Sequence, residues 1–561
     1  MQDINQNTVR EIREIILDAL GHAVSEGTLP AEPIPDFTIE VPNDRSHGDY
    51  AANVAMVSAR AFHKAPRQIA EAILPHLVFD GTVIDRAEIA GPGFLNFYIG
   101  DAWYDAAVDT VLSEGENYGR SDFGKGKRVL VEFVSANPTG PMHIGNARGG
   151  ALGDGIAASL DAAGFDVARE FYVNDAGNQI NKFGASLSVR YQQLCGSDIE
   201  IPEDCYLGED IIAHARAFRE LHGDAYMQSS EDERRDALVA YALPLNIEGL
   251  ERDLLKYRIK YDCWFKESTL HNNGEVARII ERLKETGCTY EQEDALWFKA
   301  TDFGCDKDFV LVRSNGIPTY IVPDIAYHYN KLVTRGFDLA VNVLGADHHG
   351  YVPRLKAAMQ ALGVDPDRIC VVLMQMVRLV RDGQEYKLSK RSGKAISLAT
   401  LLDEIDIDAA RMFFNLREPA THFEFDLDLA LEQSSQNPVY YVQYAHARIC
   451  SILRNLTEDG VDVAAMKTAA GHYTEEAERE LIRFITGYTS EIVSAARTYN
   501  PARLTKYALE LATLFHKFYN TCRVKCDDEA VMAARVKLCL AAKQTLYNCL
   551  TLLKITAPEK M

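Results

Sequence analysis

The chain has little that would carry it into a membrane or out of the cell. Its 561 residues contain no apolar run of about 18, the length that a membrane-spanning helix needs. Residues 1–14 are polar and carry no signal-peptide pattern. The eleven cysteines are scattered, without a Cys-x-x-Cys pair, which disfavours disulfides and zinc sites. We therefore expect a cytoplasmic protein with reduced thiols and no membrane contact.

Internal repeats and low-complexity tracts are absent as well. The composition is that of an ordinary globular protein, with 47% hydrophobic and 25% charged residues. Because 561 residues are too many for one hydrophobic core, the length predicts several domains.

The net charge of −22 argues at first against a nucleic-acid partner. Two stretches depart from this balance. Residues 501–561 hold ten Lys and Arg against five Asp and Glu, and residues 368–394 hold seven against two. Binding depends on the local field rather than on the total charge, but a solvated surface would give the same counts. Charge alone leaves the question open.

The pattern of helices and strands divides the chain into three units. Residues 1–112 predict a small α/β domain, followed by a linker at 113–127 that is rich in Gly, Ser and charge. Residues 125–404 predict a second domain with a charged, helical insertion at about 195–300. Residues 405–561 have an almost wholly helical pattern and predict an antiparallel bundle.

Strands and helices alternate through the second domain. Strand patterns occur at 128–135, 167–175, 308–314, 339–345 and 369–377. Such alternation predicts a parallel sheet that is covered on both faces. Sheets of this kind bind ligands beyond the carboxyl ends of their strands, where helix N-termini supply amides.

The stretch PTGPMHIGN (138–146) lies at such a place, between a strand and a helix predicted over 143–163. Gly140 and Gly145 would let a nucleotide approach the backbone closely. His143 can donate to a phosphate from the first helical turn. Taken alone, the stretch is explained equally well as a Pro-Gly turn before a helix.

A basic loop follows the last strand of the domain. YKLSKRSGK (386–394) carries Lys387, Ser389 and Lys390, a spacing that suits the neutralisation of a departing pyrophosphate. In isolation, an exposed basic loop explains this stretch as well.

Together the two stretches resemble the H-I-G-H and K-M-S-K-S signatures of class I aminoacyl-tRNA synthetases. The flanking segments are similar to arginyl-tRNA synthetases: VEFVSANPTGPMHIGNARGGALGD, REFYVNDAGNQI, LVRSNGIPTYIVPDIAYH, LGADHHGYVPRLKAA and NPVYYVQYAHARI. The similarity extends from HGDYAAN in the first unit to the C-terminal bundle. It implies an α/β fold with a Rossmann-like parallel-sheet catalytic domain, an N-terminal domain that contacts tRNA and an all-α anticodon-binding bundle.

The resemblance implies an arginine–tRNA ligase. Such an enzyme joins the carboxylate of L-arginine to the α-phosphate of ATP, releases pyrophosphate, and passes the arginyl group to the terminal ribose of tRNA(Arg). ATP is then a substrate, and Mg²⁺ accompanies its phosphates. The expected partners are tRNA(Arg) and L-arginine, and the protein is expected to be a monomer.

The resemblance also implies roles for individual residues. The ATP-binding set is Pro138, Gly140, His143, Gly145, Asn146, Lys387, Ser389 and Lys390, of which His143, Asn146, Lys387 and Lys390 would be catalytic. The arginine-binding set is Glu132, Ser135, Asn137, Tyr320, Asp324 and His348. The tRNA-binding set is Tyr440, Tyr441 and Arg448.

Chemistry supports part of the arginine set. A guanidinium is planar and always charged, so carboxylates and aromatic faces suit it. Tyr320 and Asp324 stand four residues apart and would share one face of a helix. Without the resemblance, a helix-surface pair would explain them.

Asn146 departs from the family signature, which has histidine at this position. Its amide can donate to a phosphate or ribose oxygen but cannot become cationic. Two alternatives therefore stay open: a synthetase for another amino acid, and a non-catalytic RNA-binding paralogue. ADHHGY (346–351) does not predict zinc, because adjacent side chains rarely converge on one ion.

Overall fold

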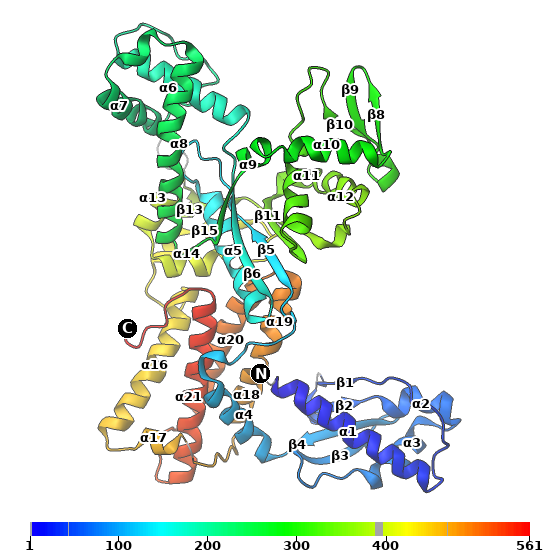
Figure 1. Cartoon of the computed structure of the whole chain (residues 1–561). Helices are drawn as coiled ribbons and strands as arrows, with labels where there is room; N and C mark the ends of the chain where they lie inside the picture. Colours follow the sequence, from blue (N-terminus) through cyan, green and yellow to red (C-terminus); the bar gives the residue numbers. More distant parts are fainter. Residues whose placement is uncertain (1–2, 43, 387–396, 468) are drawn as a thin grey trace.

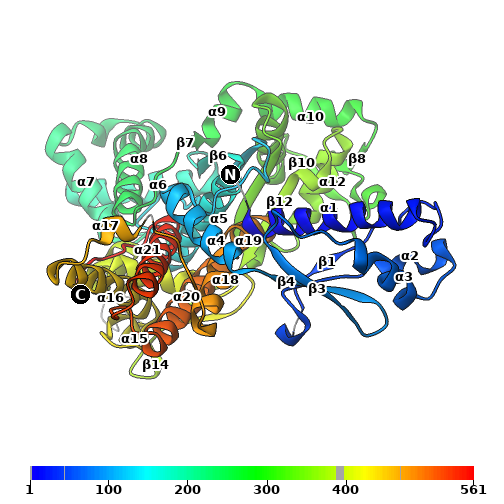
Figure 2. The same cartoon turned by 90° about the horizontal axis from the view of Figure 1, so that it is seen from below.

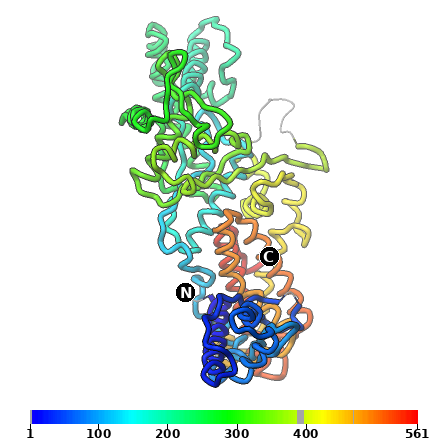
Figure 3. The backbone as a smooth tube through the Cα atoms, turned by 90° about the vertical axis from the view of Figure 1, so that its right-hand side faces the viewer, coloured from blue at the N-terminus to red at the C-terminus, as the bar shows by residue number. Residues whose placement is uncertain are grey.

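A computed structural model describes residues 3–42, 44–386, 397–467 and 469–561. Figure 1 shows a central α/β region between a helical insertion and a C-terminal helical bundle. The N-terminal unit lies beside the bundle, at the end of the molecule opposite to the insertion (Figures 1 and 3). Within these ranges, no helix combines the length and apolar character that crossing a bilayer requires.

The N-terminal unit packs one long helix and two short ones on an antiparallel sheet. Helix α1 (Ile4–Ser25) begins at Asp3, whose side chain accepts from the amide of Gln6. The strands pair in the order β1-β2-β4-β3. Their bounds, with those of the short helices, are β1 Ile39–Glu40, β2 Tyr50–Ala52, α2 Val54–Phe62, α3 Pro66–Ile73, β3 Ile84–Ala90 and β4 Phe94–Ile99.

Helix α4 (Asp101–Glu114) connects this unit to the bundle, as the view from below in Figure 2 shows. Its Asp105 and Asp109 accept from Nζ of Lys537, a buried residue of the bundle, at 2.6 and 2.8 Å. The predicted linker at 113–127 packs against the bundle too, where the buried Tyr118 donates to the carbonyl of Ile485 at 2.8 Å.

A five-stranded sheet with the order β12-β11-β5-β6-β7 forms the centre of the molecule. All four pairings are parallel, which confirms the predicted fold class. Strand β5 lies in the middle, and Val129, Leu130 and Val131 are fully buried, as a sheet covered on both faces requires. The bounds are β5 Arg128–Glu132, β6 Asp166–Val173, β7 Cys263–Lys266, β11 Leu339–Gly345 and β12 Ile369–Met374.

The strand predicted at 308–314 does not belong to this sheet. Strand β10 (Phe309–Val312) pairs antiparallel with β9 (Ala295–Phe298), which forms a hairpin with β8 (Thr289–Gln292). Glu293 and Asp294, at the hairpin turn, both have positive φ, 54° and 57°, as a tight primed turn demands. The alternation of strands and helices predicted a further parallel strand at 308–314. In the structure this segment pairs with the local β8–β9 hairpin instead.

The stretch at 195–300 is helical only in its first part. Helices α7 (Glu209–His222) and α8 (Glu231–Lys256) come from this part and, with the preceding α6 (Asn178–Leu194), form the insertion that projects from the sheet in Figure 1. The rest supplies β7, β8 and β9, together with α9 (Glu267–Asn272) and α10 (Glu275–Glu285). The predicted helical insertion therefore fits only the first part of this stretch, and the prediction missed the edge strand β7 of the central sheet.

From Ser397 onward, the described residues form a helical bundle with one strand. Strand β15 (Phe423–Asp426) pairs in parallel with β13 (Val377–Arg381), and β13 also pairs with β14 (Gln384–Glu385). The helices are α13 Leu398–Glu404, α14 Ile407–Phe414, α15 Leu427–Leu431, α16 Pro438–Glu458, α17 Val463–Met466, α18 Glu476–Thr486, α19 Tyr488–Thr498, α20 Ala502–Thr521 and α21 Glu529–Leu552.

Helix α5 (Ile144–Ala162) crosses from the sheet to the bundle and is buried along nearly its whole length. A methyl group on Gly153 would lie 2.2 Å from the ring of Phe133, so glycine lets the helix approach β5. The next residue, the fully buried Asp154, accepts from Arg411 of α14 at 2.6 Å and from Lys554 at 3.0 Å. These charge-assisted bonds fix the helix that begins at the PTGPMHIGN stretch.

Candidate active site

The chain turns sharply where β5 ends. Val134 and Ser135 have φ values of 68° and 41°, in the left-handed region that branched residues rarely adopt. Ser135 Oγ donates to Glu132 Oε1 at 2.9 Å and accepts from the amide of Tyr172 at 3.1 Å. The neighbouring strands therefore hold a strained turn in place, an arrangement that is concentrated at functional sites.

His143 and Asn146 cap the N-terminus of α5 reciprocally. The amide of Gly145 donates to His143 Nδ1 at 3.1 Å, and the amide of His143 donates to Asn146 Oδ1 at 3.1 Å. Because Nδ1 accepts, the neutral ring carries its proton on Nε2 and can donate it to a ligand. Burial lowers the pKa of His143 and favours this neutral form.

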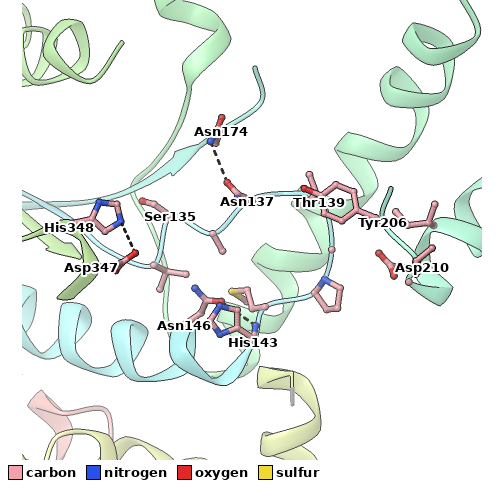
Figure 4. Close-up of a pocket in the computed structure, with 18 residues that line it drawn as sticks. Ser135, Asn137, Thr139, His143, Asn146, Asn174, Tyr206, Asp210, Asp347 and His348 are labelled. Carbon is pink, nitrogen blue, oxygen red and sulfur yellow. Dashed lines mark hydrogen bonds and ion pairs between the residues drawn. The ribbon is translucent and has the colours of Figure 1, made fainter. Parts of the chain in front are cut away.

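The side-chain amide nitrogen of Asn146 is available to donate to a ligand. Its oxygen serves the cap, and its Nδ2 has no hydrogen-bond partner among the residues that the structure describes. The side chain lines the cavity beside His143 (Figure 4). The residue that departs from the family signature thus offers a neutral donor at the helix N-terminus, as its chemistry predicts.

Gly145 gives the His143 ring its position. A methyl group here would lie 2.8 Å from His143 Cε1 and 3.0 Å from Nδ1, so the ring would have to move. We expect Gly145→Ala to lower kcat/KM for ATP by about 10-fold or more, since small misplacements of a catalytic group are costly. Initial rates at varied ATP measure this.

Gly21→Ala in α1 provides the control, because nothing lies within 4 Å of a methyl group there. Both substitutions favour the helix, by up to about 1 kcal/mol. A Gly145→Ala enzyme with the wild-type kcat/KM would show that the ring position is unimportant.

A cavity of about 780 Å³ opens beyond the carboxyl ends of the strands (Figure 4). It brings together six of the predicted residues: Ser135, Asn137, Gly140, His143, Asn146 and His348. The structure adds residues that the sequence did not indicate, among them Asn174, Tyr206, Asp210 and Asp347. Tyr206 and Asp210 come from the insertion, which therefore forms one wall of the cavity.

The insertion also holds the turn before α5. Asn246 of α8 donates to the carbonyl of Pro138 at 2.9 Å, and His214 of α7 contacts Asn246 Oδ1 at 2.8 Å. Gly140 lies beside the Asp210 carboxylate, where an added methyl group would come within 3.4 Å of Oδ2. Pro138 and Gly140 thus shape the turn.

Three carboxylates, those of Asp324 on α11 (Ile321–Tyr329), Glu132 and Glu267, lie close enough to influence one another. None of them lines the cavity, but Glu132 accepts from Ser135, which does. Asp324 accepts from the hydroxyl of Tyr351. Burial, and then the charges of Glu132 and Glu267, raise the pKa of Asp324 to about 7. Burial also raises the pKa of Glu267. Such a group of buried acids is suited to a cationic ligand.

Tyr320 does not line the 780 Å³ cavity either. It stands at the N-cap of α11 and is 69% exposed, facing a second cavity of about 690 Å³ with Glu267, His271 and Arg313. Glu267 therefore lies between this second cavity and the acid cluster. It was missed because it comes from the segment interpreted as a helical insertion, directly after the short and only partly apolar strand β7.

Arg148 is a structural residue. It is 1% exposed and donates to the carbonyls of Gln375, Glu418 and Thr421 at 2.6, 3.1 and 3.1 Å. Burial lowers its pKa to about 10. It joins α5 to the segments around β13 and β15.

Lys387, Ser389 and Lys390 lie outside the described residues. The chain returns at Ser397, which pairs with His143, and the amide of Leu398 donates to the carbonyl of Met142 at 2.8 Å. Ser397 and Leu398, which follow the basic loop in sequence, thus lie next to the start of α5.

The three residues predicted to contact tRNA lie on α16. Tyr440 stacks near Tyr444, Tyr441 contacts Thr513, and the Arg448 guanidinium lies 4.5 Å from the ring of Tyr519. They form a partly exposed group of aromatic and basic side chains on the bundle.

Asp347 and His348 approach each other at 3.9 Å at the rim of the cavity. Across the described ranges, no three His, Cys, Asp or Glu side chains are grouped to hold a metal ion.

Family models cover most of the chain. The model for tRNA synthetases class I (R), catalytic domain, matches residues 107–424. The arginyl tRNA synthetase N terminal domain matches residues 10–99, and the DALR anticodon binding domain matches residues 442–561.

Similar proteins agree over the whole length. An arginine–tRNA ligase of Caldanaerobacter subterraneus subsp. tengcongensis is 53% identical over 562 residues, and one of Ruminiclostridium cellulolyticum is 50% identical over 564, with 100% of both chains covered in each case. The fold is that of the Thermus thermophilus arginyl-tRNA synthetase, with a TM-score of 0.72 at 22% identity, covering 99% of this chain and 100% of that one. The chain therefore belongs to the arginyl-tRNA synthetases, the class I enzymes that join arginine to its tRNA.

Proposed function

We propose that arginine is activated in the 780 Å³ cavity, with ATP along the turn that leads into α5 and the guanidinium directed toward Asp324. One observation carries the proposal: a helix N-terminus with hydrogen-bond donors faces the cavity, and a group of buried acids lies behind its wall at Ser135. Helix α5 presents its N-terminus, His143 and Asn146 to one end, which suits phosphates. The buried acids around Asp324 include Glu132, which accepts from Ser135 of the cavity wall, and this negative region suits a cation.

In this arrangement the carboxylate of arginine attacks the α-phosphorus of ATP. The bond from that phosphorus to the bridging oxygen breaks, and pyrophosphate leaves. His143 Nε2–H and Asn146 Nδ2–H donate to the developing phosphate charge, and Lys387 and Lys390 neutralise the pyrophosphate. A ribose hydroxyl of the tRNA then attacks the arginyl carbonyl, and AMP leaves. Positioning and charge stabilisation suffice for both steps.

The amino-acid end is held by the turn after β5. Ser135 and Asn137 line the cavity and offer neutral hydrogen-bonding groups to the α-amino and carboxylate ends of arginine. His348 stands at the rim. We assign the guanidinium to Asp324 and Glu267, with Tyr320 available to stack on it from the second cavity.

Mg²⁺ is proposed to enter with ATP, bound to its phosphates. Asp210 and Asp347 line the cavity on separate elements. Their carboxylates would contact the water molecules bound to such an ion, and the described residues hold no cluster that would enclose it. We further propose a monomer that works in the cytoplasm. Tyr440, Tyr441 and Arg448 would contact the anticodon stem-loop by stacking and phosphate pairing.

Charging of total tRNA with labelled arginine tests the function. We expect arginylation that depends on ATP, and no charging with other amino acids. A preference for another amino acid, or no charging at all, would favour the related synthetase or the RNA-binding paralogue.

Arginine binding should depend on pH through Asp324. Its carboxyl has a raised pKa of about 7 in the free protein, and the guanidinium pairs with the ionised form. Affinity is therefore full above pH 7 and should fall by up to about 10-fold for each unit below it. Equilibrium dialysis of arginine between pH 5.5 and 8.5 measures this. An affinity that is constant over this range would contradict the assignment.

A further inference from the structure

Lys331 is a fully buried cation that has no role in the reaction proposed above. It lies in the π-helical turn at Asn330–Thr334, which continues α11, seven residues after Asp324. Its Nζ donates to Glu132 Oε2 at 2.6 Å and to Asn342 Oδ1 at 2.8 Å, and it lies 3.9 Å from the centre of the Tyr327 ring. The three N–H groups of the ammonium thus have three partners. Single π-helical turns occur frequently at functional sites.

The contacts of Lys331 continue into the wall of the cavity. Glu132 accepts from Lys331 with one carboxylate oxygen and from Ser135 with the other. Ser135 belongs to the left-handed turn after β5 and lines the cavity. A direct chain of hydrogen bonds therefore leads from the buried ammonium to the strained turn that presents the amino-acid-binding groups.

The three acids near Lys331 differ in the partners that the protein gives them. Three carboxylates, those of Glu132, Asp324 and Glu267, lie close enough to influence one another. The ammonium of Lys331 contacts only Glu132 among them within the described ranges. Glu132 is thus paired with a buried ammonium, whereas Asp324 accepts from the hydroxyl of Tyr351 and Glu267 lies 3.4 Å from His271.

We propose that Lys331 is a positioning residue for arginine binding. Its ammonium holds the Glu132 carboxylate, Glu132 holds Ser135, and this fixes the turn that carries Ser135 and Asn137. The Lys331–Glu132 ion pair also leaves Asp324 and Glu267 as the acids that pair with the guanidinium. The inference rests on the arginine pocket proposed above. Lys331 acts through Glu132 and touches neither arginine nor ATP.

The test compares Lys331→Met, the neutral pair Lys331→Met/Glu132→Gln, and Lys537→Met. Lys537 is the matched control, because it is a buried lysine with two carboxylate partners far from the cavity. The measurements are the KM values for arginine and ATP in tRNA charging at 25 °C, and the thermal midpoint from circular dichroism.

We expect Lys331→Met to raise the arginine KM about 30-fold or more and to leave the ATP KM within about threefold, because an unpaired buried carboxylate must rearrange. The neutral pair should recover thermal stability but keep an arginine KM raised about 10-fold, since an amide does not reproduce the ion pair. Lys537→Met should lose stability with both KM values unchanged.

The neutral pair keeps the test decisive if Lys331→Met does not fold. An arginine KM within twofold of wild type in the neutral pair would overturn the proposal, and so would equal changes of both KM values in Lys331→Met. Failure of the pocket assignment would look different: Asp324→Asn would then leave the arginine KM unchanged.

Discussion

Replacing Asp324 by asparagine is expected to raise the KM for arginine by about 10- to 150-fold, while the KM for ATP stays within twofold. The expected factor corresponds to the loss of one charge-assisted bond to a guanidinium, about 1.5–3 kcal/mol. The carboxylate is buried beside two other acids, so water cannot replace it as a partner for the cation. Initial rates of tRNA charging at varied arginine give the value.

Tyr351→Phe is the matched control for this substitution. It removes the hydroxyl that donates to Asp324 but keeps the carboxylate, so we expect a smaller rise in the arginine KM. The fall in arginine affinity below pH 7 should disappear in Asp324→Asn, because the titrating group is gone. An arginine KM within twofold of wild type would show that the guanidinium binds elsewhere.

The sequence predicted the parts of the fold that local patterns determine. Strand β5 and helix α5 are adjacent in the chain, and their apolar spacing and the Pro-Gly turn between them mark both ends. Strand β7 was missed because its four residues, Cys263–Lys266, pair with β6 from about 90 residues earlier and have only partly apolar character. Non-local pairing leaves no periodic signal in so short a strand.

The same distinction applies to the site. His143, Gly145 and Asn146 could be placed from sequence because a helix N-terminus is a local feature. Asp210 and Glu267 could not, because the fold brings them to the cavities from the insertion and from α9.

Lys331 had a weak signal, a lysine at the end of the apolar stretch IVPDIAYHYNKLV, but a charge there is equally typical of a helix end facing solvent. Only the structure shows that it is buried on Glu132.

The second large effect is expected at Asn146. Asn146→Ala removes the Nδ2 donor to the nucleotide, and we expect the rate of arginyl-adenylate formation to fall by about 10²-fold or more, as for other donors that act mainly in the transition state. It also removes the Oδ1 acceptor that caps the His143 amide, which costs about 0.5–2 kcal/mol of stability. Two further variants separate these effects.

Asn146→Asp keeps an oxygen for the cap and loses the donor, so it should be as stable as wild type but at least as slow as Asn146→Ala, because its charge also repels phosphate. Asn146→His restores the family signature: one ring nitrogen can accept from the His143 amide while the other donates, so much of the activity should remain. Single-turnover adenylate formation and thermal midpoints for the three variants decide between cap and donor. Fast adenylate formation in Asn146→Asp would mean that residue 146 serves only to shape the start of α5, and that the Nε2–H of His143 alone faces the phosphate.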